Sequence, residues 1–236
     1  MAKKVNTNKE ENSELQAIEG ALSSSEAFIE KNQKTLIIVL CSVIVIIGAW
    51  LLFQNLYLTP NEEAAEKEMA LGQQYFAAQQ YELALNGDSV DFSGFVALND
   101  DYSMTKSGKL AGAYAGLIYY KLGEYDKAIE FLSDYSGSDD VLNYTVQGTI
   151  GDCYVQKGEA EKAIKYFSKA AESDNILVSP IYKVKAGLVY ESLGQYDKAI
   201  ELYEEVKSNF TTKQRGIPEV DDIDKYIIAA TAKNGK

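Results

Sequence analysis

The stretch GEYDKAIE, at residues 123–130, decides the fold because the chain nearly repeats it twice. The other copies are GEAEKAIK at 158–165 and GQYDKAIE at 194–201. An active site is usually built once, whereas a segment that recurs at a fixed period builds a repeated architecture. The octet therefore predicts a repeat structure in the C-terminal half of the chain.

Further landmarks recur with the octet. The glycine that opens each octet follows another glycine by seven residues, and a tyrosine lies three residues after that earlier glycine. An alanine follows the earlier glycine by twelve residues, and the period is 35 and then 36 residues. In chain order the landmarks are Gly116, Tyr119, Gly123 and Ala128; Gly151, Tyr154, Gly158 and Ala163; and Gly187, Tyr190, Gly194 and Ala199.

This pattern predicts a pair of antiparallel helices in each copy. The second glycine ends the first helix, where a positive φ is favoured, and the alanine lets the second helix press against the first. A glycine inside the first helix costs about 1 kcal/mol in propensity, so it indicates that a neighbouring backbone comes close. We expect the tyrosine one turn later to fill the gap beside it. One such pair cannot bury its own apolar face, so the copies must stack.

A fourth, degraded copy precedes these three. Gly72, Tyr75 and Ala84 keep the offsets of the landmarks, and Gln79 stands where the turn glycine would be. About nine extra residues separate this copy from the next.

Residues 85–110 carry this insertion and are read as one more short helix, which covers the groove or the flank of the repeats. The apolar residues of that helix are Phe92, Phe95, Val96 and Leu98. A cation loop is a second reading, because Asn86, Asp88 and Asp91 lie near two glycines. Their spacing does not match an EF-hand, so Asx turns and helix caps are favoured.

The C-terminal segment PEVDDIDKYIIAATA, residues 218–232, predicts a final helix. Its early aspartates suit the positive end of a helix dipole. Four apolar residues are expected to cover the last repeat, so that the helix caps the stack: Val220, Ile223, Ile227 and Ile228.

Residues 62–214 resemble the tetratricopeptide repeat, a helix-turn-helix of roughly 34 residues with small, aromatic, glycine and alanine landmarks at these offsets. Pro180, which opens the last repeat, also fits the resemblance, whereas the usual early tryptophan is absent. The expected fold is all-α: a solenoid of about four helical hairpins with a C-terminal capping helix, preceded by a single transmembrane helix.

The transmembrane helix is expected over residues 35–58. The run TLIIVLCSVIVIIGAWLLF covers residues 35–53, and no charged residue lies between Lys34 and Glu62. Roughly 20 apolar residues cross the hydrocarbon layer as a helix. A cleaved signal peptide is not favoured, because the preceding tail is long and of mixed charge. Cys41 does not fit a lipobox, since Leu40 stands where a small residue is needed.

The basic residues near this helix favour a cytoplasmic N-terminus. Lys31 and Lys34 flank its start, whereas the first basic residue beyond it is Lys67. Residues 1–34 are then a cytoplasmic tail, which is polar and expected to be disordered over residues 1–13 and has a short amphipathic helix after them. Residues 62–236 are an extracytoplasmic repeat domain. Whether the amphipathic helix rests on the bilayer or docks on a membrane partner stays open.

Composition argues against several classes of function. The net charge of -12 is unsuited to nucleic acid, because binding a polyanion requires phosphate neutralisation by Lys and Arg. The sequence has no histidine and two cysteines, which removes histidine-based catalysis and leaves too few thiolates for a metal site. Cys153 is read as a buried thiol in preference to a nucleophile. We expect no enzymatic activity, cofactor, metal or small-molecule substrate.

The layout resembles the YfgM-type ancillary subunits of the Sec translocon: a cytoplasmic tail, one membrane helix and a periplasmic repeat domain. This resemblance implies a scaffold in the bacterial inner membrane that links a SecYEG-type translocon to periplasmic chaperones. The alternative is a structural subunit of another envelope assembly, such as outer-membrane protein insertion or secretion machinery.

Repeat solenoids bind partners on the concave face formed by the first helices. Helical projection places these residues on that face: Leu117, Tyr120, Lys121, Asp152, Val155, Gln156, Leu188 and Glu191. Tyr120, Val155 and Leu188 form an apolar row that repeat packing does not require, which indicates an interaction surface. The alternative is that the last helix, residues 220–232, fills the groove and covers the row.

Overall fold

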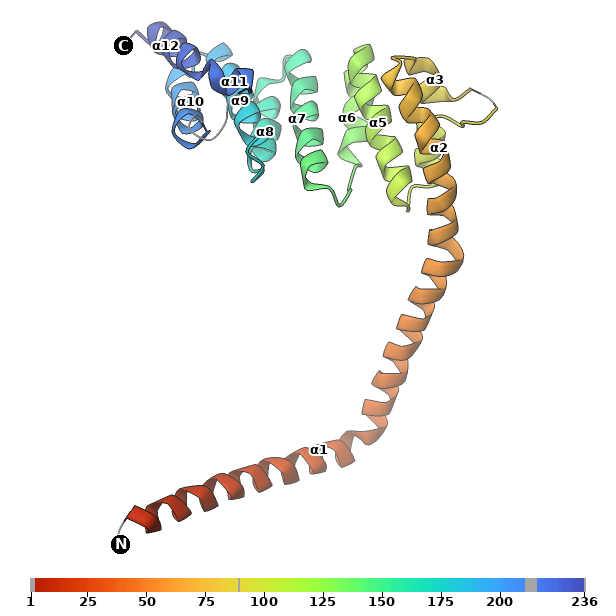
Figure 1. Cartoon of the computed structure of the whole chain (residues 1–236), viewed down its shortest axis with the longest axis vertical. Coiled ribbons are helices and arrows are strands. Elements are labelled where there is room, and N and C mark those ends of the chain that lie inside the picture. The colour runs from red at the N-terminus through yellow and green to blue at the C-terminus, as the bar shows by residue number, and fades with distance from the viewer. Residues whose placement is uncertain (1–2, 89, 211–215, 236) are drawn as a thin grey trace. The chain divides into compact units, whose positions relative to one another are not determined.

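The computed structural model describes residues 3–88, 90–210 and 216–235, with side chains from residue 28 onward. The chain divides into two compact units, Met1–Tyr57 and Leu58–Lys236. Helices account for all regular structure in the described residues, which confirms the all-α fold (Figure 1).

The N-terminal unit is helical along its described length. Helix α1 spans Lys3–Phe53, and a π-helical turn, η1, follows at Gln54–Leu58. The polar tail is therefore a continuous part of α1, and not an irregular segment followed by a separate short helix. Proline is absent before Pro60, and Lys, Glu and Ala, which favour helix, are frequent in the tail.

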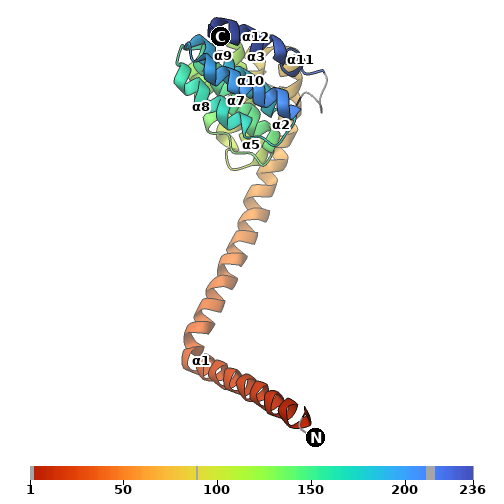
Figure 2. The same cartoon turned by 90° about the vertical axis from the view of Figure 1, so that its left-hand side faces the viewer.

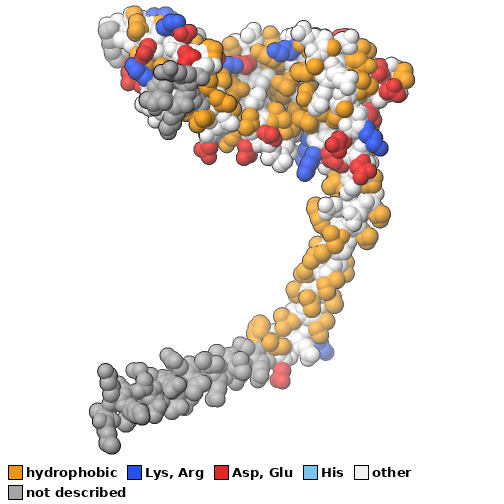
Figure 3. All heavy atoms as spheres, in the orientation of Figure 1, with side chains coloured by type: hydrophobic (Ala, Val, Ile, Leu, Met, Phe, Trp, Pro, Cys, Tyr) orange, Lys and Arg blue, Asp and Glu red, His pale blue; other side chains and the backbone are white. Residues whose placement is uncertain are grey.

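The apolar part of this helix is exposed. Within Phe28–Ala77 an 18-residue window has a mean hydropathy of 3.1, and none of that window is buried. Figure 3 shows hydrophobic side chains all along the visible face of this stretch. By length and composition this helix is able to cross a membrane.

The described residues of the C-terminal unit form four helical hairpins, which stack side by side (Figure 1). The hairpins are α2 (Thr59–Ala77) with α3 (Tyr81–Asn86), α5 (Lys106–Leu122) with α6 (Tyr125–Ser133), α7 (Asp140–Gln156) with α8 (Ala160–Ala171), and α9 (Ser179–Ser192) with α10 (Tyr196–Phe210). Helix α4 (Phe95–Asp101) lies between the first two hairpins in sequence, and α11 (Pro218–Asp221) and α12 (Ile223–Lys233) follow the last. The expected number of hairpins is confirmed.

The turn glycines have the backbone conformation that the octet predicts. Gly123, Gly158 and Gly194 have φ of 80°, 74° and 70°. The N–H of the next residue donates to the carbonyl of the landmark tyrosine at 2.9 Å in each copy. The glycine N–H donates to the carbonyl three residues earlier, which completes a Schellman motif at the end of each first helix.

The first-helix glycines make room mainly for a side chain of the second helix, and only at Gly116 does a backbone atom, the N of Leu132, also come within 3.2 Å of an added Cβ. In each copy the residue sixteen positions after the glycine occupies the space of the missing Cβ. An added Cβ would come within 2.6 Å of Leu132 at Gly116, 2.6 Å of Phe167 at Gly151 and 2.3 Å of Tyr203 at Gly187. The landmark tyrosine therefore does not fill this gap.

The ring of the landmark tyrosine instead contacts the lysine of the octet. The lysine ammonium lies over the face of the tyrosine ring, a favourable cation–π arrangement. The distances from Nζ to the ring centroid are 5.0 Å for Lys127 and Tyr119, 5.1 Å for Lys162 and Tyr154, and 5.2 Å for Lys198 and Tyr190. The octet thus joins the two helices of a hairpin through its glycine, lysine and alanine, and the alanines are fully buried.

The insertion supplies the core of the first hairpin. Phe92, Phe95 and Leu98 are buried, and the rings of Phe92 and Phe95 fill the space beside Gly72. The expected short helix is present as α4, but it begins at Phe95, so Phe92 lies in the loop before it. Helix α4 packs against α2, α3 and α5 within this core and does not cover the groove.

The loop before α4 is organised by Asp88, as the Asx-turn reading predicts. One carboxylate oxygen accepts from the backbone N–H groups of Val90, Asp91 and Phe92 at 2.9–3.0 Å, and the other accepts from the Tyr75 hydroxyl at 2.8 Å. These bonds hold the pKa of Asp88 well below its usual range, the N–H of Val90 contributing most.

The C-terminal segment caps the stack as two helices, and not as one. Val220 and Ile223 are buried with Tyr203 and Val206 of α10. Figure 2 shows α11 and α12 beside α10 at this end of the stack. Ile227 is partly buried, whereas Ile228 is 69% exposed, contrary to expectation. Ile223 and Ile227 lie one turn apart on the covered face of α12, so the next residue, Ile228, falls on the outward face.

Candidate functional site

The first helices carry all eight residues predicted for the groove. Leu117, Tyr120 and Lys121 lie on α5; Asp152, Val155 and Gln156 lie on α7; Leu188 and Glu191 lie on α9. These helices occupy equivalent positions in successive hairpins. We call Tyr120, Val155 and Leu188 the apolar row.

The apolar row is open to solvent. The side chains of Val155 and Leu188 are 41% and 44% exposed, and Tyr120 is partly buried against the ring of Tyr125. Partial burial raises the pKa of Tyr120, with smaller contributions from Asp152, Cys153 and Tyr125. Helix α12 packs on α10, so it leaves Val155 and Leu188 uncovered. The alternative of a groove filled by the last helix is therefore wrong for these two residues.

Two acidic residues of the predicted groove are neutralised from within the domain. The carboxylate of Asp152 accepts two hydrogen bonds from the Lys185 ammonium of the next hairpin, at 2.6 and 2.9 Å. Glu191 accepts from the Tyr203 hydroxyl and from the Lys233 ammonium of α12, both at 2.8 Å. Its side chain is 9% exposed. Glu191 thus joins the last hairpin to its cap.

The remaining predicted residues fall into two groups. Leu117 packs against the core cluster of Leu132, Val146 and Ile150, whereas Lys121 and Gln156 are exposed at the ends of their helices. The surface that the structure brings together is therefore an apolar row with polar groups at its edge and with internal ion pairs. Sequence projection missed Lys185 and Lys233, because they pair with residues 33 and 42 positions away.

Cys153 has the burial and the raised thiol pKa that disfavour a nucleophilic role. Its side chain is fully buried, and burial raises the pKa of the thiol to about 12. The thiolate, which is the nucleophilic form, is therefore scarce at neutral pH. Within the described ranges, no group of three or more Cys, Asp or Glu residues is placed to hold a metal ion.

The tetratricopeptide-repeat family model matches residues 115–135, 144–176 and 182–208. These three segments are tetratricopeptide repeats. They coincide with the three hairpins that share the octet, and such repeats form scaffolds for protein interaction. The sequence matches none of the curated proteins with which it was compared.

Two crystal structures of MamA are similar to the chain. In the first, the sequences are 21% identical, the match covers 74% of this chain and 93% of MamA, and the TM-score is 0.47. In the second, the identity is 20%, the match covers 70% of this chain and 94% of the other, and the TM-score is 0.45.

Proposed function

We propose that the chain is a membrane-anchored, non-enzymatic scaffold whose apolar row binds a segment of a partner protein. The observation that carries this proposal is the exposure of Val155 on α7 and of Leu188 on α9, the first helices of adjacent tetratricopeptide repeats. Exposed apolar side chains in a row are typical of interaction surfaces. The apolar stretch of α1, of which no residue is buried, supports anchoring by a single span.

The layout of tail, span and repeat domain supports a role beside the Sec translocon, linking it to periplasmic chaperones. In this arrangement the N-terminus is cytoplasmic and the repeat domain lies in the periplasm. The partner then contacts the row while the span keeps the domain next to the translocon. A subunit of another envelope assembly is the competing proposal.

Site-specific photo-crosslinking in cells tests the surface and the partner together. A photoreactive residue at 155 or 188 should form adducts with translocon subunits or a membrane-bound chaperone. The same residue at 204, where Glu204 is exposed on α10, serves as the matched control. Adducts with outer-membrane machinery would favour the competing proposal, and equal adducts at all three positions would contradict the row as a binding surface.

The orientation is tested separately by cysteine labelling. Ser208 is exposed on α10, so Ser208→Cys in a chain without Cys41 and Cys153 provides a single accessible thiol. An impermeant reagent should label it in cells whose outer membrane alone is permeabilised. Labelling that requires lysis of the inner membrane would place the domain in the cytoplasm.

A further inference from the structure

The first turn of α2 is tied to the start of α5. One carboxylate oxygen of Glu62 accepts from the N–H of Lys106 at 2.6 Å. The other accepts from the N–H and the hydroxyl of Ser107, at 3.0 and 2.7 Å. The turn that carries Met104 and Lys106 is therefore held beside residue 62.

This turn is close to the end of the apolar helix. Glu62 follows Leu58 by four residues, and four residues reach at most about 14 Å even when fully extended. If the apolar helix spans a membrane, the start of α5 lies near the bilayer surface whatever the angle between the two units.

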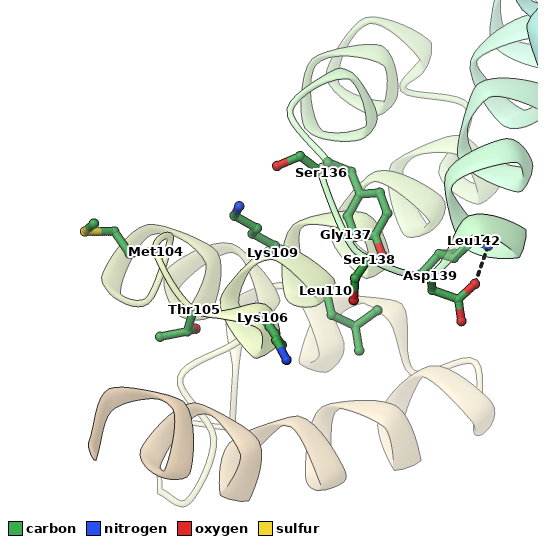
Figure 4. A pocket seen from close by; sticks show the side chains of 11 residues that line it. Met104, Thr105, Lys106, Lys109, Leu110, Ser136, Gly137, Ser138, Asp139 and Leu142 are labelled. Atoms are coloured by element: carbon green, nitrogen blue, oxygen red, sulfur yellow. Dashed lines mark hydrogen bonds between the residues drawn. The ribbon is translucent and has the colours of Figure 1, made fainter. Parts of the chain in front are cut away.

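A cavity of about 400 Å³ opens between the start of α5 and the loop that leads to α7. Figure 4 shows Lys106, Lys109 and Leu110 on α5, with Asp139 and Leu142 on the opposite side. The lining combines basic side chains with apolar ones, as contact with a phosphate group and the adjoining acyl region requires.

The two lysines are available for an external anion. Within the described part of the chain, neither Lys106 nor Lys109 has an acidic partner within ion-pair distance. The nearby carboxylates already accept other hydrogen bonds, since Glu62 binds the start of α5 and Asp139 accepts from the N–H of Leu142 at 2.8 Å.

The surroundings of the lysines are amphipathic. Met104 is 59% exposed and Val141 is 45% exposed at this edge. Acidic side chains of α2 are also present, and Figure 3 shows basic and acidic groups side by side where α2 and α5 begin. Because the chain carries a net charge of -12, an anionic bilayer repels most of its surface. Lys106 and Lys109 are basic groups at this edge that favour the contact.

We propose that this edge of the domain rests on the lipid surface, with Lys106 and Lys109 bound to phosphate groups of anionic phospholipids and Met104 in the interfacial layer. The inference rests on the membrane anchoring in the proposed function and adds a second, electrostatic contact. That contact restricts how the repeat domain tilts, and so holds the apolar row at a defined height above the bilayer.

The test uses the full chain in vesicles with equal parts of phosphatidylglycerol and phosphatidylcholine. A fluorophore is attached through Met104→Cys in a Cys41→Ser chain, because buried Cys153 does not react. A nitroxide on the lipid headgroup should quench this fluorophore at least about twofold more than one attached through Ile228→Cys on α12. The difference should shrink in phosphatidylcholine alone and at high salt, since screening weakens the attraction.

Lys106→Gln combined with Lys109→Gln should remove the extra quenching. The matched control, Lys165→Gln combined with Lys225→Gln, removes the same charge from exposed positions on α8 and α12. It should leave the extra quenching intact. A chain that floats with vesicles but shows equal quenching at both positions would overturn this inference and leave the anchor standing. A chain that does not float with vesicles would overturn the anchor itself.

Discussion

Gln79 occupies the position that glycine fills in the three later turns. Its φ is 58°, and it is the one non-glycine residue with a positive φ among those described. Its N–H and that of Gln80 form the same two Schellman hydrogen bonds, to Phe76 and Tyr75. The backbone of the degraded repeat therefore follows the same path without its glycine.

Gln79→Gly should stabilise the domain. A left-handed conformation costs a non-glycine residue about 1–2 kcal/mol, and the greater freedom of glycine in the unfolded chain returns part of that gain. The expected net increase in the free energy of unfolding is about 0.5–1 kcal/mol, measured by urea denaturation. As the converse, Gly158→Ala should be destabilising, although its Cβ would meet nothing within 4 Å. An unchanged midpoint for both variants would contradict this account.

Asp88 makes the stability of the first hairpin depend on pH. Its folded-state pKa is lowered by three backbone N–H groups and the Tyr75 hydroxyl, so the unfolded chain takes up the proton first as the pH falls. Its contribution is complete at neutral pH and is lost below about pH 4, the ordinary pKa of aspartate. Asp88→Asn should therefore lose less stability than the wild type between pH 6 and pH 3. If the wild type and Asp88→Asn lost the same free energy of unfolding over this pH range, Asp88 would not be the source of the pH dependence.

At the scale of the element, the two helices of each regular hairpin meet where a large side chain of the second helix packs against a glycine of the first. The fitted residue is Leu, Phe or Tyr in the three regular copies, and its volume varies while its position does not. In the first copy this place is taken by Phe95 of α4 and by Phe92 of the loop before it. The packing of a large side chain on this glycine therefore recurs from hairpin to hairpin, whereas the identity of that side chain differs.

Gly151→Ala should destabilise the domain by about 1–3 kcal/mol, because the new methyl group overpacks the ring of Phe167. Phe167→Ala alone should also be destabilising, through the cavity it leaves. In the Phe167→Ala background the effect of Gly151→Ala should largely disappear. A double-mutant cycle from thermal unfolding measures this coupling, and strict additivity would exclude direct contact as the cause.

At the scale of the whole chain, α11 and α12 cover the end of the stack and leave the first-helix face open. Their apolar residues complete a core with Val184, Tyr203 and Val206. Lys233 and Asn234 bind Glu191 and Asp197 across the junction, each at 2.8 Å. A solenoid needs such an end, because its terminal repeat otherwise exposes the face that a neighbour would bury.

Deletion of residues 216–236 should lower the free energy of unfolding by about 3 kcal/mol or more, since Tyr203 and Val206 would lose their cover. The deleted chain should also self-associate, which light scattering would detect. Ile228→Gln lies on the exposed side of α12 and should change neither property. A deletion variant that melts like the wild type would show that the last hairpin does not depend on this cap.

The octet, the glycine, tyrosine and alanine landmarks spaced around it, and the apolar run of residues 35–53 were sufficient to predict the hairpins, their turns, the number of copies and the apolar helix. These features depend on the backbone conformation and polarity of adjacent residues, such as the positive φ at Gly158, so the local sequence carries them. Only the tertiary structure determined which residues make the long-range contacts. Among them are the packing of Phe167 on Gly151, the burial of Phe92 in the first core and the pairing of Glu191 with Lys233. Each of these contacts requires segments that are distant in sequence to be complementary in shape or charge. The periodicity of the sequence does not specify which of several suitable side chains makes the contact.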